Sequence, residues 1–462
     1  MKFFGKRSFH GGIHMGDGSD KKLTSKDKMI FYNPKTVEIS MKQSGASPCN
    51  PLVSVGDRVI KGQVIGTPTR FGVANIHASI SGTVMDMVTN KDLQHNDVTV
   101  VTIEADTNNG ENKPGTEITN DQDYHKGFAD VSSYTREEII SSMKDGGLIG
   151  MGGAGFPTHV KYETDKTIDY VLINAAECEP YLTCDHRLIL EFGYDILNGV
   201  SLLLKASGAK KAIICIEDNK TDIADYLNDL LLEEGLPIEV KLLETRYPQG
   251  GERQLTEAVI GMEVPAGKLP ADIGVIINNV ATVKAIADIM FTNTPLIYRC
   301  ITITGKVKKP ANYFVPIGTR FTELVDLSGG FTTVYNRVIV GGPMTGNGIL
   351  YSGGISDLEG SVTKTSSGLL VLEDHTIIES PCIRCGECER VCPAGLAPYK
   401  IDHAFIIRDY DLCEKLHSTE CISCGSCSFV CPAKRELAYR TTGARYTVAD
   451  IRAKRRVKQN EK

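Results

Sequence analysis

The sequence predicts a multidomain α/β protein with two β-rich units, a central parallel-sheet domain and a cysteine-rich helical unit. Three observations lead to this fold class. Strand-like and helix-like segments alternate through residues 130–298, as is typical of a parallel sheet covered by helices. Short β-branched runs lie on both sides of that region, and eight of the fourteen cysteines form two runs near the C-terminus. A chain of 462 residues has room for about three domains or more.

The composition is that of an ordinary globular protein, with a net charge of −6 and 41% hydrophobic residues. It excludes collagen-like and disordered chains. The longest candidate for a membrane span, residues 274–291, is interrupted by asparagine, lysine and aspartate, whereas a spanning helix needs about 20 apolar residues. The N-terminus has charges but no apolar core with a cleavage site, so we expect no signal peptide.

Basic charge is concentrated at the two ends of the chain. Residues 434–462 carry ten lysines and arginines against three acidic residues, and residues 1–30 carry seven against three. We set apart a basic N-terminal segment, 1–30, and a basic C-terminal tail, 436–462. Such segments suit attachment to an acidic partner or an anionic membrane face. Two solvated tails are an equally good interpretation.

Residues 31–120 predict a small β sandwich or barrel, because short β-branched runs alternate with glycines around 55–66 and 76–84. This pattern resembles the barrel-sandwich fold of biotinyl and lipoyl carriers. A carrier needs a lysine at its hairpin tip, and the segment between the two halves, 67–75, contains none. We therefore interpret the domain as a structural module.

The central region, 130–298, predicts a Rossmann-like parallel sheet. Each strand-like run is followed by a helical pattern, and the four runs are 170–174, 211–216, 238–243 and 274–277. Ligands of such sheets bind outside the carboxyl ends of the strands. The loops that follow the strands are therefore the candidate binding residues.

Four loops of this domain carry glycines or polar side chains. The glycine-rich loop 150–161 contains G-x-G-x-x-G, but helical residues precede it and Pro157 follows, so it is a poor Rossmann fingerprint. Its backbone amides could still approach a phosphate, with Lys161 as a countercharge. Any one of the loops could be an ordinary turn, but four at one sheet edge indicate a binding site; the other three are 174–180, 247–253 and 278–282.

The two cysteine runs, in a predicted helical domain at 375–435, share the spacing C-x2-C-x2-C-x3-C-P. In the bacterial ferredoxin pattern the fourth cysteine of each run ligates the other cluster. All-cysteine zinc sites use two CxxC pairs and do not need this arrangement. The spacing thus predicts one [4Fe–4S] cluster on Cys382, Cys385, Cys388 and Cys431, and a second on Cys421, Cys424, Cys427 and Cys392.

The residues between the runs, 396–413, have the apolar spacing of a helix. The six other cysteines have no partner at ligand spacing, and we interpret them as plain thiols: Cys49, Cys178, Cys184, Cys215, Cys300 and Cys413.

The sequences GGAGFPTHVK, NAAECEPY and YPQGGERQL resemble the flavin- and NADH-binding subunit of respiratory complex I. Together with the paired cysteine runs and the flanking domains, residues from about 5 to 435 resemble the RnfC family of Rnf electron-transport complexes. Residues 299–372, which begin ITITG after the first two positions, resemble the SLBB β-grasp domain of the same relatives. We expect that domain to join the flavin domain to the cluster domain by packing.

The resemblance implies a set of cofactor-binding residues. Phe156 is expected to stack on the dinucleotide and Glu179 to hydrogen-bond it. Three positions depart from the complex I pattern, where Met151, Ala176 and Arg253 replace Arg, Asp and Glu. The residues implied around FMN are Gly150, Gly152, Gly153, Lys161, Asn174, Glu177, Gly251, Glu252, Asn278, Asn279 and Thr282.

The function implied by the resemblance is that of a peripheral subunit of a membrane-bound, ion-translocating ferredoxin:NAD oxidoreductase. It would pass electrons between NAD(H) as substrate, FMN and two [4Fe–4S] clusters, and a flavin suits that role because it couples two-electron to one-electron transfer. The implied partners are the other Rnf subunits and, indirectly, ferredoxin, at the cytoplasmic face of the cell membrane. We expect no nucleic-acid partner and no catalytic proton donor among the side chains.

Two alternatives remain at this point. The same domain order occurs in cobalamin reductases and related soluble flavin and iron–sulfur carriers. A second alternative is a pure iron–sulfur electron wire in which the flavin site is vestigial. The sequence does not decide the coupling ion, Na⁺ or H⁺, or the direction of electron flow.

Overall fold

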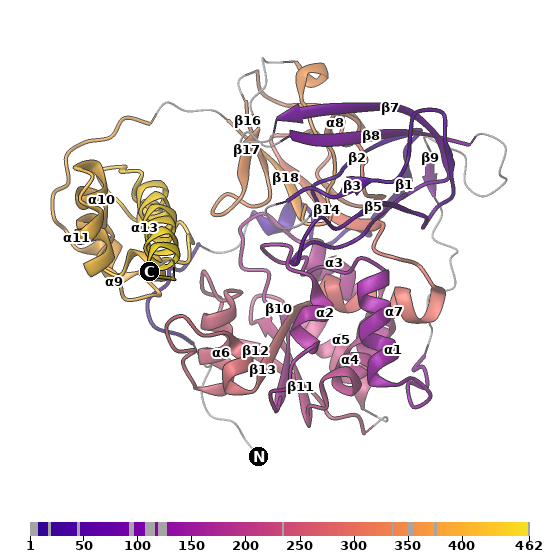
Figure 1. Cartoon of the computed structure of the whole chain (residues 1–462), viewed down its shortest axis with the longest axis horizontal. Coiled ribbons are helices and arrows are strands. Elements are labelled where there is room, and N and C mark those ends of the chain that lie inside the picture. The colour runs from indigo at the N-terminus through magenta and orange to yellow at the C-terminus, as the bar shows by residue number, and fades with distance from the viewer. Residues whose placement is uncertain are drawn as a thin grey trace.

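The computed structural model describes residues 8–16, 20–43, 47–91, 97–106, 116–118, 127–232, 235–334, 336–349, 354–373 and 377–460. Parts of the predicted basic segments 1–30 and 436–462 therefore lie outside the described residues. Two β-rich units and the parallel-sheet domain form a main body, and the cysteine-rich helices stand at one side of it (Figure 1). The predicted multidomain α/β class is confirmed.

The N-terminal β module consists of two small sheets. One contains β2 (Thr36–Ser40), β8 (Asp97–Ala105), β7 (Gly82–Lys91) and β4 (Arg58–Val59), and the other contains β3 (Asn50–Pro51), β5 (Val64–Thr67) and β6 (Ile76–His77). Alternate residues point into the shared core, as the period of a strand requires. Val37 and Ile39 of β2 meet Val101 and Ile103 of β8 there, all fully buried.

The central sheet has four parallel strands in the order β12-β11-β10-β13, with bounds Ile238–Leu243, Lys211–Glu217, Tyr170–Ala175 and Val275–Asn279. Both faces are buried, which explains the near-continuous apolar runs in the sequence. Ile173 packs on one side and Leu172 on the other.

Helices cover both faces of the central sheet. Helix α6 (Glu252–Ile260) packs on the Leu172 side. The Ile173 side is covered by α1 (Arg136–Asp145), α3 (Cys184–Glu191), α4 (Gly193–Ser207), α5 (Thr221–Leu231) and α7 (Val280–Thr292). The single helix that we predicted over 182–206 was wrong, because Phe192 leaves helical geometry at φ −132° and separates α3 from α4.

The second β-rich unit is a seven-stranded sheet in the order β17-β16-β18-β14-β15-β1-β9. The outer pair, β1 (Ile30–Asn33) and β9 (Thr116–Ile118), comes from the range around 31–120 that we assigned to the N-terminal module. This pairing fastens the start of the chain to the later sheet. The remaining elements are β14 (Tyr298–Gly305), β15 (Ala311–Pro316), α8 (Phe321–Leu327), β16 (Asn336–Val340), β17 (Asn347–Ile349) and β18 (Gly368–Glu373).

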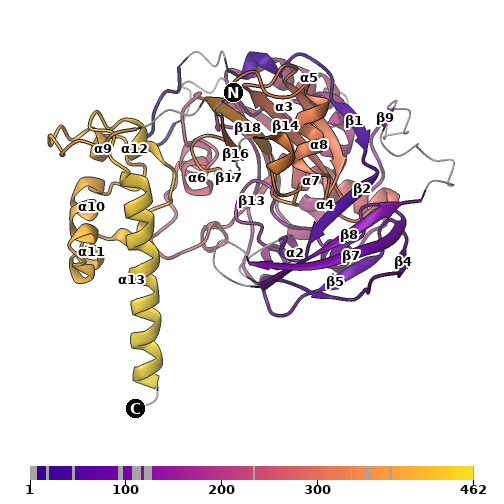
Figure 2. The same cartoon turned by 90° about the horizontal axis from the view of Figure 1, so that it is seen from above.

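The cysteine-rich unit is helical. Its elements are α9 (Glu387–Arg390), α10 (Pro398–Ile406), α11 (Tyr410–Lys415), α12 (Ser426–Phe429) and α13 (Leu437–Asn460). The single helix predicted over 396–413 was wrong, since Arg408 has φ +59° and separates α10 from α11. The C-terminal part of α13 projects away from the body (Figure 2).

Short elements complete the described chain: α2 (Thr158–Tyr162) and the 3-10 turns η1 (Lys21–Leu23), η2 (Pro270–Ile273), η3 (Ile355–Asp357) and η4 (Ser418–Glu420). Over the described residues, every helix is too short or too polar to cross a membrane.

Candidate cofactor sites

The carboxyl edge of the central sheet brings the predicted loops together. Asn174 near the end of β10 pairs in register with Asn279 at the end of β13. The side chain of Asn174 donates from Nδ2 to the carbonyl oxygen of Gly250, 2.8 Å away. Asn279 caps α7 by accepting the amide of Ala281 at 2.9 Å. Three loops far apart in the sequence therefore meet at one edge.

The glycine-rich loop lies against the start of α7. The amide of Gly150 donates to the carbonyl oxygen of Phe156, which closes the loop on itself. The amide of Met151 donates to Thr282 Oγ1 at 3.0 Å. A Cβ on Gly152 would lie 2.8 Å from Cβ of Asn279, whereas a Cβ on Gly153 would meet no atom within 4 Å. The first glycine thus permits close packing, and the second leaves backbone open to a ligand.

Lys161 spans two of the other loops. Its ammonium group lies 2.9 Å from Glu252 Oε1, next to Gly251 at the start of α6, and 2.8 Å from the carbonyl oxygen of Ile277. Asn278 donates from Nδ2 to the buried hydroxyl of Tyr162 at 2.6 Å. The positive charge of Lys161 is therefore held at the sheet edge, where an anionic ligand could share it with Glu252.

Glu177 has an unusual environment within this edge. Its backbone is left-handed at φ +46°, and its Oε1 accepts the amide of Asp185 at 2.8 Å. Its Oε2 is buried and has no hydrogen-bond partner among the described residues. Burial raises the pKa of Glu177 to about 7, although the nearby ammonium of Lys21 opposes the shift. A buried acceptor without a donor fits a ligand that brings one.

Phe156 and Glu179, the two residues expected at the dinucleotide, differ in their surroundings. Phe156 is 41% exposed, so a face of its ring remains available for stacking. The carboxylate of Glu179 instead accepts the amide of Met344 at 3.0 Å and the hydroxyl of Thr345. Both donors come from the loop between β16 and β17.

Sequence reasoning missed three charged residues at this edge. Arg299, at 2% exposure, comes from β14 and donates to the carbonyl oxygens of Met151 at 3.1 Å and Ser366 at 2.6 Å. Asp185 accepts from Asn279 Nδ2 at 2.6 Å, and Lys21 donates to three carbonyl oxygens of the loop that contains Glu177. Asp185 follows a recognisable loop and could have been suspected, but Arg299 and Lys21 lie in distant segments that carry no motif.

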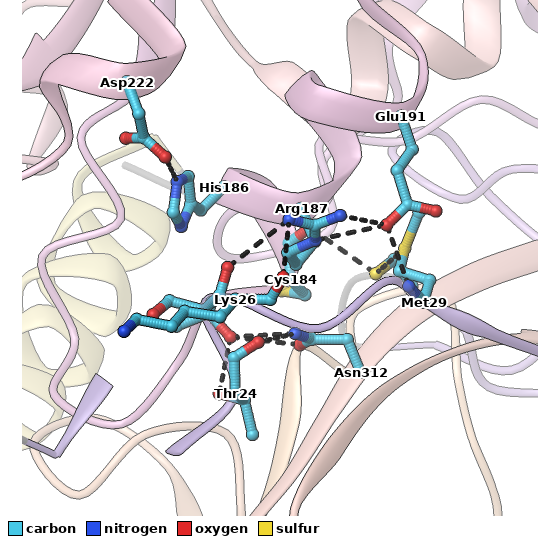
Figure 3. Close-up of polar contacts among 12 residues, drawn as sticks. Thr24, Lys26, Met29, Cys184, His186, Arg187, Glu191, Asp222 and Asn312 are labelled. Carbon is cyan, nitrogen blue, oxygen red and sulfur yellow. Dashed lines mark hydrogen bonds and ion pairs between the residues drawn. The ribbon is translucent and has the colours of Figure 1, made fainter. Parts of the chain in front are cut away.

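Helix α3, which carries Asp185, is itself fastened to the N-terminal segment (Figure 3). Arg187 reaches the carbonyl oxygen of Lys26 at 3.4 Å and pairs with Glu191 at 2.7 Å. Glu191 also accepts the amide of Met29 at 2.8 Å. These contacts fix the helix against a segment more than 150 residues earlier in the chain.

The eight cysteines of the two runs surround two separate cavities. One cavity is lined by Cys382, Cys385, Cys388 and Cys431, and the other by Cys392, Cys421, Cys424 and Cys427. These are the two sets that the ferredoxin spacing predicts. The other six cysteines line neither cavity.

Both cavities have the donors that an iron–sulfur cluster requires. Backbone amides point at ligand sulfurs: Arg384 to Cys382 and Ser423 to Cys421, each at 3.4 Å. Burial and the neighbouring thiols raise the pKa of Cys388. Four thiolates in one cavity repel each other, so a bound cluster that carries positive iron would remove a cost that the free protein must otherwise bear by protonation.

Four known domain families match the sequence. They are the RnfC barrel sandwich hybrid domain over residues 7–108, the Nuo51 FMN-binding domain over 143–288, the SLBB domain over 300–348 and a 4Fe-4S dicluster domain over 381–436. The fold and these matches define an electron-transfer protein with an FMN-binding domain and an iron–sulfur domain.

Curated relatives narrow this class. The chain is 38% identical over 456 residues, 97% of its length and 98% of the relative's, to the RnfC-type component of the Na(+)-translocating ferredoxin:NAD(+) oxidoreductase complex of Acetobacterium woodii. It is 37% identical, over 85% of its length and 83% of the relative's, to the corresponding component of the proton-translocating complex of Clostridium ljungdahlii. The chain therefore belongs to the RnfC family of ion-translocating ferredoxin:NAD(+) oxidoreductase complexes.

A solved structure, an NAD+-reducing [NiFe]-hydrogenase in the air-oxidized state, is similar to 61% of this chain and 54% of its own, at 22% identity and a TM-score of 0.47. The chain thus spans about half the length of that structure. The two RnfC relatives, which match over most of their length, favour a component of such a complex over the soluble cobalamin reductase and the pure electron wire.

Proposed function

We propose that this chain is the peripheral component that binds NAD(H), FMN and two [4Fe–4S] clusters in a membrane-bound, ion-translocating ferredoxin:NAD oxidoreductase complex. The observation that carries the proposal is the presence, in one chain, of two four-cysteine cavities and a loop-lined edge of a parallel sheet. The family assignment supports the same function.

The residues at the sheet edge fit FMN. When bound, FMN supplies the exchange of two electrons with nicotinamide and of single electrons with an iron–sulfur centre. Gly150, Gly152 and Gly153 would offer backbone to the cofactor, and Lys161 would balance its negative charge. The unpartnered Oε2 of Glu177 would accept a hydrogen bond from it. The rest of the proposed site is Asn174, Gly251, Glu252, Asn278, Asn279 and Thr282.

NAD(H) would bind at the outer side of that edge. The exposed ring of Phe156 is free to stack on a flat ligand. Glu179 would contact the dinucleotide by exchanging its present bond from Thr345 for a ligand hydroxyl. The role of these residues is to orient the ligand and exclude water, and no side chain needs to move a proton.

The cysteine sets would each hold one [4Fe–4S] cluster, which supplies one-electron transfer. The amide–sulfur bonds from Arg384 and Ser423 stabilise negative charge on the ligands, a feature that tunes cluster potentials. The fourth cysteine of each run would ligate the cluster of the other run, so the two sites would form as one folded unit.

The partners in this proposal are the membrane components of the complex and, through them, ferredoxin. Part of the basic charge of α13 is already paired, because Arg452 and Arg455 contact Glu414 at 2.6 and 2.8 Å. An electrostatic attachment to membranes predicts that high salt releases the chain from a membrane fraction. Retention of the chain through salt washing would contradict attachment of that kind.

The flavin site is tested by the affinity for FMN, measured by quenching of flavin fluorescence in the full chain. Replacing Lys161 with alanine removes a charge-assisted contact and should weaken FMN binding roughly tenfold or more. Lys166 makes a similar pair with Asp272 at 2.7 Å, so Lys166→Ala is a matched control that should leave the affinity unchanged. Equal affinities for both variants would remove Lys161 from the site.

A further inference from the structure

The two cysteine loops have nearly the same backbone. Arg384 and Ser423 occupy equivalent positions and both have φ +58°, while Gly386 and Gly425 have φ +80° and +81°. In each loop an amide donates to the first cysteine at 3.4 Å. The spacing alone therefore gives no reason to assign the two cluster sites different places in an electron path.

The surroundings of the second loop break this symmetry. The hydroxyl of Tyr247, which belongs to the loop after β12, donates to the carbonyl oxygen of Cys424 at 2.7 Å. Tyr247 is 2% exposed and packs with Ile13 and Val391, and Cys178 and Cys424 lie against this cluster. The loop around Cys424 is thus joined directly to the flavin domain.

The glycines show the same difference. A Cβ on Gly425 would lie 2.8 Å from the carbonyl oxygen of Met344, in the loop that also donates to Glu179. A Cβ on Gly386 would meet no atom within 4 Å. Cys382 and Cys385 are exposed, and Ile383 between them is 68% exposed. The first loop therefore faces solvent.

A strap formed by residues 8–16 reinforces the second junction. The amide of Gly12 donates to the carbonyl oxygen of Val391, and Ile13 exchanges two hydrogen bonds with Tyr247, all at 2.8 Å. Gly11 has φ +75°, and a Cβ there would lie 2.8 Å from the carbonyl oxygen of Cys392. The strap thus holds Cys392, a ligand of the second set, against the loop of Tyr247.

We propose that the set Cys392, Cys421, Cys424 and Cys427 is the inner cluster site, which faces the flavin domain, and that Tyr247 is the positioning residue that joins the two. The set Cys382, Cys385, Cys388 and Cys431 is then the outer site, through which the chain exchanges electrons with a partner. Electron transfer slows steeply with distance, so this order decides which site communicates with the flavin. The inference rests on the proposed function.

The test is a redox titration of the reconstituted full chain, followed by electron paramagnetic resonance. Cys385→Ala should abolish the outer signal and Cys421→Ala the inner signal, which assigns the two. Tyr247→Phe removes the hydroxyl donor beside Cys424 and should shift the midpoint potential of the inner signal alone. Tyr439→Phe, at a residue that is 75% exposed, is the matched control and should shift neither.

A shift of the outer signal in Tyr247→Phe, or of neither, would overturn the assignment. Should Tyr247→Phe fail to fold, iron release from the wild-type chain to a chelator decides the question. The outer signal should then disappear first, and loss of both signals at one rate would overturn the proposal. FMN affinity is measured on the same samples, so a chain that keeps this order but binds no FMN refutes the proposed function and not the order.

Discussion

The cysteine-rich unit and the edge of the central sheet both gather polar groups around a cofactor site, but over very different lengths of chain. Three ligands of each cluster site come from seven consecutive residues, 382–388 or 421–427. The sheet edge instead takes Lys21, Met151, Asp185 and Arg299 from segments that span most of the body. The difference shows that the first site depends on local spacing and the second on how whole units pack.

The largest effect should come from a single ligand of the locally built site. Cys388→Ala removes one thiolate from its set and should cost about half of the bound iron, since each cluster needs four ligands. FMN affinity should not change. Iron analysis after reconstitution measures the loss, with Cys413→Ala as a control for a buried thiol outside both cavities. Full iron content in Cys388→Ala would contradict the ligand assignment.

At the sheet edge, the sharpest perturbation should act from another unit. Arg299→Met leaves the carbonyl oxygens of Met151 and Ser366 without their donor and removes a cation near Asp185. We expect a loss of roughly 3–5 kcal/mol in the free energy of unfolding, together with weaker FMN binding and unchanged iron content.

Arg320→Met is the control for this prediction. Arg320 lies in the same unit and pairs with Glu38 at 2.7 Å, but its side chain is 44% exposed. An exposed ion pair is worth about 1 kcal/mol or less. Chemical denaturation of both variants measures the difference, and equal losses would mean that Arg299 does not organise the edge.

A smaller effect should appear in the dependence of stability on pH. Burial raises the pKa of Glu177 from 4.5 to about 7, so the folded state binds this proton more tightly than the unfolded state. The contribution is fully present below pH 4.5 and is lost as the pH rises towards 7. Glu177→Gln should flatten the stability curve over that window, by at most about 3 kcal/mol. Parallel curves for the variant and the wild type would contradict the raised pKa.

The same contrast explains how much could be predicted from the sequence. The cysteine spacing predicted two ligand sets that the structure gathers in two cavities, because a local repeat encodes its own geometry. The strand–helix alternation predicted which loops meet, because parallel strands end at one edge. Arg299 could not be predicted, since it lies within a buried strand of a different unit.

The surroundings of individual loops were also hidden from the sequence. The engagement of Glu179 by Met344 and Thr345 depends on the packing of two domains. So does the difference between Gly386 and Gly425, which have the same motif and the same backbone angles. Local pattern determined these conformations, and only the tertiary contacts gave the two loops different neighbours.

The central claim is that one chain joins an NAD(H)-reactive flavin site to two iron–sulfur sites. The most direct test is to titrate the anaerobically purified full chain, loaded with iron and FMN, with NADH while recording its visible spectrum. We predict that flavin absorbance bleaches first and that cluster absorbance then decreases. If FMN is bound and both clusters are present but NADH leaves the spectrum unchanged, the sheet edge is not an NAD(H)-reactive flavin site and the account is contradicted.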